Sequence, residues 1–128
     1  MSVGYWRIGE DDDEAAALLD VAKVCGIRFS RAEEPFLVAV DDEDGVVGGA
    51  AVSSNAYDDE WVFSVVVLPR YQGRGVGREI IRRVVAAARA EDTERLVGDV
   101  VNDRLRPHLR RLGFRDVPGT RLVELVLE

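Results

Sequence analysis

Three closely spaced glycines and two arginines, in the run Gln72-Gly73-Arg74-Gly75-Val76-Gly77-Arg78, form the part of this sequence best suited to chemistry. Glycine lets the backbone turn sharply and approach a ligand without an intervening side chain. The run lies between an apolar strand pattern and a helical pattern, so its N–H groups lack partners within the helix. Such a nest of N–H groups at the positive end of a helix dipole favours an anion. We therefore predict a phosphate-binding loop.

The two arginines of the run strengthen this prediction. A cation at the N-terminus of a helix costs roughly 0.3–1 kcal/mol at an exposed site. A sequence adjusted only for helix stability would carry Asp or Glu in place of Arg74 and Arg78. A bound phosphate reverses the sign of that interaction, so the arginines indicate a ligand rather than a simple tight turn.

Other phosphate motifs fit the run poorly. A dinucleotide fingerprint needs its third glycine at position 78, which is Arg78. The triphosphate loop needs Gly-Lys-Ser/Thr, and a serine hydrolase needs a Gly-x-Ser-x-Gly elbow; the sequence has neither. Since His108 is the only histidine, we expect no metal site.

Hydrophobic periodicity predicts an α/β (α+β) chain with a single mixed, mostly antiparallel central sheet flanked by helices. Its unbroken apolar character predicts that Trp61 to Leu68 is buried on both faces. The expected strands cover Val3 to Ile8, Phe36 to Val40, Val46 to Ser53, Trp61 to Leu68, Arg95 to Val101, Arg115 to Val117 and Leu122 to Leu127.

Three helices are expected from the longer periodic segments. They cover Asp13 to Val24, Gly75 to Ala90 and Asp103 to Leu112. On the first, Ala16, Leu19, Ala22 and Lys23 recur at helical spacing, and Gly26 is expected to end the helix. The acidic residues before this helix complement its dipole and do not indicate a metal site. The acids at 41–44 are interpreted as a solvated turn that closes a hairpin.

Composition limits the class of protein. The 128 residues fit one domain, residues 1–128, and 47% hydrophobic residues can bury a core. A net charge of −7, from 24 acidic and 17 basic residues, argues against nucleic acid as a partner. The sequence has no apolar run of membrane-spanning length and no leader pattern, so we expect a cytoplasmic protein without membrane contact.

Cysteine and lysine each occur once in the sequence, and both are informative. Cys25 is the only cysteine, which excludes an internal disulfide, and we expect a small hydrophobe near the end of the first helix rather than a catalytic thiol. Lys23 is the only lysine in this acidic chain. High acidity with almost no lysine suggests adaptation to high salt, which salt-dependent unfolding would support.

The central motif resembles that of the GCN5-related N-acetyltransferases (GNAT family). The resemblance rests on Val65-Val66-Val67-Leu68-Pro69-Arg70-Tyr71-Gln72-Gly73-Arg74-Gly75-Val76-Gly77, and on Asn102 followed by Leu112-Gly113-Phe114. It is specific from about Trp61 to Phe114, and the order of strands and helices agrees over the rest. The second helix usual in that family is expected to be shortened into Arg28 to Glu34.

The resemblance implies that acetyl-CoA, or a related acyl-CoA, is the donor. Backbone groups at Gly73 to Arg78 would hold the pyrophosphate, and Val65 to Val67 would pair with the pantetheine arm. Val67 or its neighbour would offer an N–H to the thioester oxygen. Asn102 would contact the cofactor arm or cap the next helix. The implied cofactor-binding residues are Val65, Val66, Val67, Gln72, Gly73, Arg74, Gly75, Val76, Gly77, Arg78 and Asn102.

The catalytic acid usual in the resembling family is missing. That family often places a tyrosine where this sequence has Leu109, which cannot donate a proton. His108 is a weak substitute, because adjacent helical residues point about 100° apart.

The usual base positions are also changed. They hold Ser64 and Val97 here, which leaves Asp99 as the nearest carboxylate candidate and Glu60 as the next. Solvent could accept the amine's proton, and positioning alone supplies much of the acceleration in such a transfer.

The leading reading is an enzyme that transfers an acetyl group from acetyl-CoA to an amine by direct attack. The acceptor would be a small-molecule amine, a protein N-terminus or a lysine, entering opposite the cofactor between Val65 and Asp99. The alternative is a sensor that binds acyl-CoA without turnover, which Leu109 and Ser64 favour. Homodimers are common in the resembling family, although the sequence marks no interface.

Overall fold

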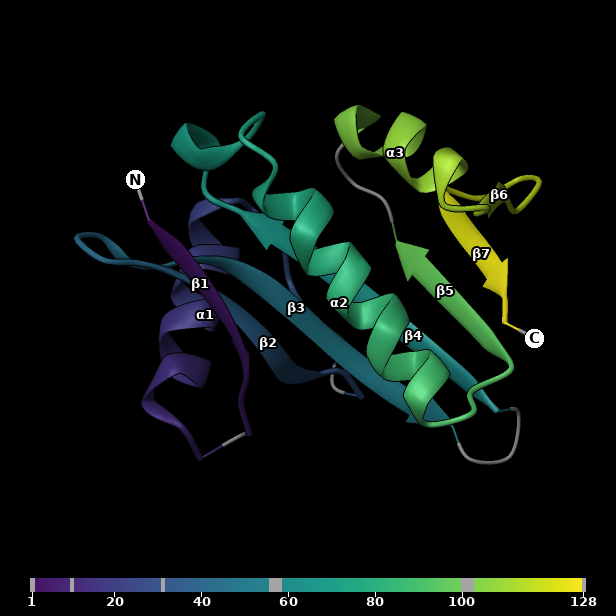
Figure 1. Ribbon diagram of the computed structural model, residues 1–128, viewed down its shortest axis with the longest axis horizontal. Coiled ribbons are helices and arrows are strands. Elements are labelled where there is room, and N and C mark those ends of the chain that lie inside the picture. The colour runs from purple at the N-terminus through teal and green to yellow at the C-terminus, as the bar shows by residue number, and fades with distance from the viewer. Residues whose placement is uncertain (1, 10, 31, 56–58, 100–102, 128) are drawn as a thin grey trace.

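Seven strands form one sheet in the order β1-β2-β3-β4-β5-β7-β6 (Figure 1). All neighbouring pairs are antiparallel except β4 and β5, which are parallel. The computed structural model describes residues 2–9, 11–30, 32–55, 59–99 and 103–127. The strands are β1 (Val3–Arg7), β2 (Glu34–Asp41), β3 (Gly45–Asn55), β4 (Glu60–Val67), β5 (Arg95–Asp99), β6 (Arg115–Asp116) and β7 (Leu122–Val126).

Three α-helices accompany the sheet: α1 (Asp13–Val24), α2 (Val76–Ala90) and α3 (Arg106–Arg111). Two 3₁₀ turns, η1 (Pro69–Tyr71) and η2 (Asp103–Leu105), precede α2 and α3. In Figure 1, α2 crosses the near face of the sheet and α1 lies behind it. Within the described residues, none of the helices is long and apolar enough to cross a membrane.

The two helices bury different apolar sets on the two faces of the sheet. Ile80, Ile81 and Val84 of α2 are at most 1% exposed and pack in one cluster with Phe63 and Val67 of β4. On the opposite face, α1 packs against β2 and β4 in a second cluster that contains Leu18, Val38 and Val66. Neighbouring residues of β4 therefore serve opposite faces, as expected for a strand buried on both.

Among the described residues, strand β4 extends beyond its pairing with the parallel strand β5. The register between β4 and β5 extends from Glu60 opposite Arg95 to Phe63 opposite Gly98. Pairing with β3 continues to Val67 opposite Gly48. The described part of β5 therefore leaves residues 64–67 of β4 without a strand partner on that side. Figure 1 shows the arrowheads of β4 and β5 parting at this point.

The bounds predicted for the first helix are confirmed, and of the residues noted there at helical spacing only Ala22 faces the core. Ala22 is buried, whereas Ala16 is exposed and Leu19 is 45% exposed. The buried set is Ala15, Leu18, Val21 and Ala22. The pair Ala15 and Leu18 and the pair Ala16 and Leu19 are both apolar and both have helical spacing. Which pair is buried therefore depends on how α1 packs on the sheet.

Two connecting segments also differ from expectation. The described part of residues 28–33 contains no helix, and β2 already begins at Glu34. The helix predicted from Asp103 is divided into η2 and α3, because Pro107 favours a helix start rather than a helix interior. Part of the turn predicted after Asn55, at 56–58, and the end of the strand predicted from Arg95, at 100–102, lie outside the described residues.

Replacing Gly98 with alanine should destabilise the fold where β4 and β5 part. A Cβ at Gly98 would lie 2.7 Å from the Cζ atom of the Phe63 ring, which is only 3% exposed. We expect the free energy of unfolding to fall by about 1–3 kcal/mol, measured by urea denaturation. Gly9→Ala is the control, because its Cβ would approach nothing closer than 3.9 Å. Equal stability of the two variants would contradict the packing described here.

Candidate functional site

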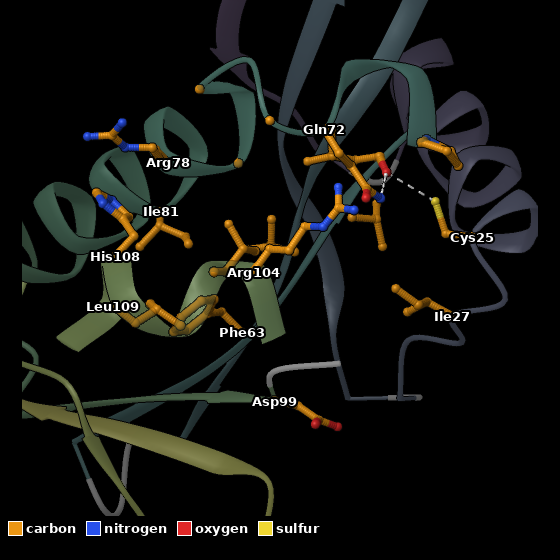
Figure 2. A pocket seen from close by; sticks show the side chains of 18 of the residues that line it. Cys25, Ile27, Phe63, Gln72, Arg78, Ile81, Asp99, Arg104, His108 and Leu109 are labelled. Atoms are coloured by element: carbon orange, nitrogen blue, oxygen red, sulfur yellow. Dashed lines mark hydrogen bonds between the residues drawn. The ribbon is translucent and has the colours of Figure 1, made fainter. Parts of the chain in front are cut away.

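A cavity of about 480 Å³ opens where β4 extends beyond the β5 pairing (Figure 2). Its walls come from the C-terminal end of α1 and the segment after it, the ends of β4 and β5, the glycine loop with the N-terminal end of α2, and the η2–α3 segment. The lining residues include Val65, Val66, Val67, Gln72, Gly73, Gly75, Gly77 and Arg78 from the predicted cofactor-binding set, together with both catalytic candidates, Asp99 and His108. Asn102 lies outside the described residues.

The glycine run has the backbone that the sequence predicts. Gly73 and Gly75 have φ angles of +76° and +87°, in the left-handed region where side chains are strained. Gly75 is the N-cap of α2, and no side chain of the described residues caps this helix. The first N–H groups of α2 therefore remain available to a ligand at the edge of the cavity.

The end of β4 is tied to its surroundings through one carbonyl. Val67 O accepts a hydrogen bond from Gln72 Nε2 at 3.0 Å and one from Cys25 Sγ at 3.4 Å (Figure 2). Burial raises the pKa of the Cys25 thiol, which keeps it protonated as a donor. Cys25 is half-buried beside the cavity and holds the strand end, so it is more than the small hydrophobe expected.

The backbone of β4 presents alternate residues to the cavity. Leu68 N donates to Val47 O of β3, so Val66 also directs its N–H and C=O towards β3. Val65 and Val67 then direct theirs to the opposite side, where the described part of β5 offers no paired residue. Because Val67 O is already occupied, the groups best placed for an added strand are both backbone groups of Val65 and the N–H of Val67.

A buried tyrosine anchors the loop to the β2–β3 hairpin. Tyr71 is 4% exposed, and its hydroxyl donates to Asp44 Oδ2 at 2.5 Å. This bond and burial raise the pKa of Tyr71 to about 12. Arg70 pairs with the same carboxylate at 3.4 Å, and the Arg74 guanidinium lies 5.5 Å from the centre of the Tyr71 ring.

The acidic turn at 41–44 was predicted to be solvated, and for Asp41 this is wrong. Asp41 is 5% exposed, and its Oδ2 accepts N–H bonds from Glu43 and Asp44 at 3.1 Å each. Burial opposes its ionisation, but these N–H groups and Tyr71 hold the pKa of Asp41 below its ordinary value. The carboxylate folds the turn back on itself, as Asx turns do.

Of the two catalytic candidates, Asp99 is engaged in an ion pair. Arg121 Nε lies 2.7 Å from Oδ1 without hydrogen-bond alignment, and a terminal nitrogen of Arg121 donates to Oδ2 at 3.1 Å. Glu60, the next candidate, pairs with Arg95 at 2.7 Å at the opposite end of β4 from the cavity. Both carboxylates therefore already have cationic partners.

His108 and Leu109 lie side by side on α3 but point differently. Leu109 is 1% exposed in the core cluster that contains Phe63. His108 is 8% exposed and lies near Arg78 and Ile81 of α2 (Figure 2). Burial lowers the pKa of His108, and Arg78, Arg111 and Arg82 lower it further. The imidazole is therefore neutral at physiological pH and is directed away from the position of the missing tyrosine.

A second cavity of about 310 Å³ adjoins the first, and Ile27, Val65 and Asp99 line both. Its walls come from the segment after α1, the middle of β4 and the β6–β7 hairpin. Glu33 is one of its lining residues, and the Oε2 oxygen of Glu33 is buried and has no partner among the described residues. The other oxygen, Oε1, accepts the N–H of Ser30 at 3.1 Å.

Sequence reasoning missed Glu33, and a local signal for it existed. Ser30 and Glu33 have the Ser-x-x-Glu spacing of a capping box, in which the glutamate accepts the serine N–H. No local sequence pattern predicts that this segment lies close to β4 and β5. Within the described residues, no group of three or more His, Cys, Asp or Glu side chains is arranged to hold a metal ion.

The chain belongs to the Acetyltransferase (GNAT) family, whose sequence pattern matches residues 3–114. None of the curated proteins matches the chain. The resemblance seen in the glycine loop and in Gly113-Phe114 is therefore confirmed at the level of the family, and the predicted fold class is confirmed with it.

Solved structures agree on the fold. A GNAT family acetyltransferase from Brucella melitensis, in complex with acetyl-CoA, has a TM-score of 0.74 at 21% identity, covering 99% of this chain and 89% of its own. An N-acetyltransferase from Staphylococcus aureus Mu50 has a TM-score of 0.72 at 16% identity, with full coverage of both chains. Nourseothricin acetyltransferase has a TM-score of 0.62 at 22% identity, covering 77% of this chain and 67% of its own.

Removing the Tyr71 hydroxyl should loosen the loop and change the alkaline stability of the protein. Since the pKa of Tyr71 is raised from 10.0 to about 12, its hydrogen bond contributes stability that is fully present below pH 10 and is lost towards pH 12. We expect Tyr71→Phe to unfold at lower urea concentration than wild type at pH 8. The difference should shrink between pH 10 and 12. A difference that stays constant over this range would contradict the Tyr71–Asp44 anchor.

Proposed function

We propose that this protein transfers an acetyl group from acetyl-CoA to an amine, and that the glycine loop binds the donor's pyrophosphate. The observation that carries the proposal is the left-handed Gly75 at an uncapped helix start, beside an edge of β4 that has no strand partner among the described residues. Backbone N–H groups at such a helix start suit a phosphate. Membership of the family, and the Brucella melitensis structure with acetyl-CoA, support the same donor.

The pantetheine arm would lie along β4 as an added strand. Val65 supplies a donor and an acceptor, and Val67 supplies a donor, because the Val67 carbonyl is held by Gln72 and Cys25. The two tethers fix the strand end before the donor binds, which reduces the ordering that binding requires. A β4 N–H near the thioester would stabilise negative charge as it develops on the carbonyl oxygen.

The acceptor amine would enter through the second cavity, which meets the first at Ile27, Val65 and Asp99. The amine nitrogen forms a bond to the acetyl carbon, and the bond from that carbon to the CoA sulfur breaks. One proton leaves the amine, and the thiolate departs with the electron pair. Among the described lining residues of the second cavity, only Glu33 and Asp99 carry carboxylates, and Asp99 is paired with Arg121. Glu33 is therefore the better acceptor for the amine's proton.

Measuring thiol release from acetyl-CoA across a panel of amines tests the activity. Small amines, polyamines, amino acid amides and peptides with free N-termini or lysines should include a substrate that gives release above the hydrolysis rate. Binding of acetyl-CoA without release over the whole panel would favour the alternative, a non-catalytic sensor of acyl-CoA. Absence of any CoA binding would contradict both readings.

A branched side chain at Gly75 should abolish donor binding. Gly75 has a φ of +87°, so valine would strain the loop and reorient the N–H groups that the phosphate needs. We expect Gly75→Val to weaken binding of CoA at least about 100-fold by isothermal titration calorimetry. Gly119→Val is the matched control, since Gly119 has a φ of +76° in the β6–β7 connection and equally open surroundings. Unchanged affinity in Gly75→Val would show that the loop does not hold the donor.

Substitutions at the two carboxylates distinguish the proposed proton acceptor from its neighbour. Glu33→Gln should lower kcat by about 100-fold while the Kd of acetyl-CoA stays within about twofold. Asp99→Asn should lower kcat less, because Arg121 already engages its carboxylate. A larger loss of kcat in Asp99→Asn than in Glu33→Gln would assign proton removal to Asp99 instead.

A further inference from the structure

His108 lines the main cavity and has a buried polar atom that the proposed acetyl transfer does not use. The residue is 8% exposed, and its Nε2 has no hydrogen-bond partner among the described residues. A histidine with a purely structural role normally satisfies its buried nitrogens, since an unpaired buried polar atom costs about 1–3 kcal/mol. Nε2 therefore lacks a partner that a ligand bound in the adjoining cavity could supply.

The wall around His108 is strongly cationic. Arg78 of α2, Arg104 of η2 and Arg111 of α3 line the same cavity as the imidazole. Arg82 also acts on it, but Glu79 pairs with Arg82 at 2.8 Å and offsets that charge. The only carboxylate among the described lining residues is Asp99, which Arg121 engages. The charges of Arg78 and Arg111 both act on His108, and such like charges repel one another unless an anion lies near them.

The kind of anion follows from the donors. Two guanidinium groups and a neutral imidazole N–H together offer several hydrogen-bond donors and no negative charge. That combination suits the three oxygens of a phosphate monoester. It does not suit the acceptor amine, which is itself cationic before it loses its proton.

We propose that His108, Arg78 and Arg111 form a second phosphate site that takes the 3′-phosphate of the CoA donor, apart from the pyrophosphate at the glycine loop. This inference rests on the proposed function, because it assigns the other end of the same ligand. Arg78 belongs to the first turn of α2 and also lines the cavity beside His108, so it joins the two phosphate positions. The ribose of CoA carries its phosphate monoester a few bonds from the pyrophosphate, which matches two adjacent anion sites in one cavity.

The site predicts discrimination between CoA and 3′-dephospho-CoA, which lacks only this phosphate. In calorimetric titrations at about 0.15 M salt, wild type should bind CoA at least about tenfold more tightly than 3′-dephospho-CoA. In Arg111→Gln and in His108→Leu that ratio should fall towards one, through weaker binding of CoA and unchanged binding of the dephospho compound. Arg111 is exposed, so its variant should fold even if the His108 variant does not.

Arg89→Gln is the matched control, because it removes one exposed charge from the far end of α2 and should keep the wild-type ratio. Equal affinities for the two compounds in wild type, or a ratio that survives in Arg111→Gln, would overturn the second site while leaving the proposed function intact. Failure of both compounds to bind would overturn the proposed function together with the inference. Weaker binding of both compounds in Arg111→Gln, at a constant ratio, would assign Arg111 to the pyrophosphate and also overturn the second site.

Discussion

The parallel pairing of β4 with β5 ends early, and the rest of the site depends on this. Within the described part of the chain, this pairing covers only Glu60–Phe63 against Arg95–Gly98, while antiparallel pairing with β3 continues along β4 to Val67. A strand held on one side only leaves backbone groups that need partners. Here those groups line a cavity at the start of α2, so an extended ligand can complete the strand while its anionic end reaches the helix terminus.

The surrounding structure makes this open edge rigid. Gln72 and Cys25 both hold the Val67 carbonyl, and Tyr71 links the loop to the Asp44 hairpin. The helices α1 and α2 bury apolar residues against opposite faces of β4. The loop is thereby fixed to the sheet at several points, which favours preorganised binding over ordering on contact.

The parts predicted correctly from sequence have strong local signals. The bounds of α1, the long apolar stripe of α2, and the sharp backbone turns at Gly73 and Gly75 all follow from periodicity and backbone chemistry. The parts missed depend on tertiary contacts. Whether Leu18 or Leu19 is buried depends on how α1 lies on the sheet, and Asp41 is buried because its hairpin returns to Tyr71. Likewise, only the fold brings Glu33 beside β4 and Arg121 beside Asp99.

A crystal structure of the protein with CoA would test the central claim most directly. The account predicts the pyrophosphate within hydrogen-bond distance of N–H groups at positions 73–78, with the pantetheine amides bonded to backbone groups of Val65 and the N–H of Val67. A cofactor bound elsewhere, or one whose pantetheine arm makes no backbone contact with β4, would contradict it.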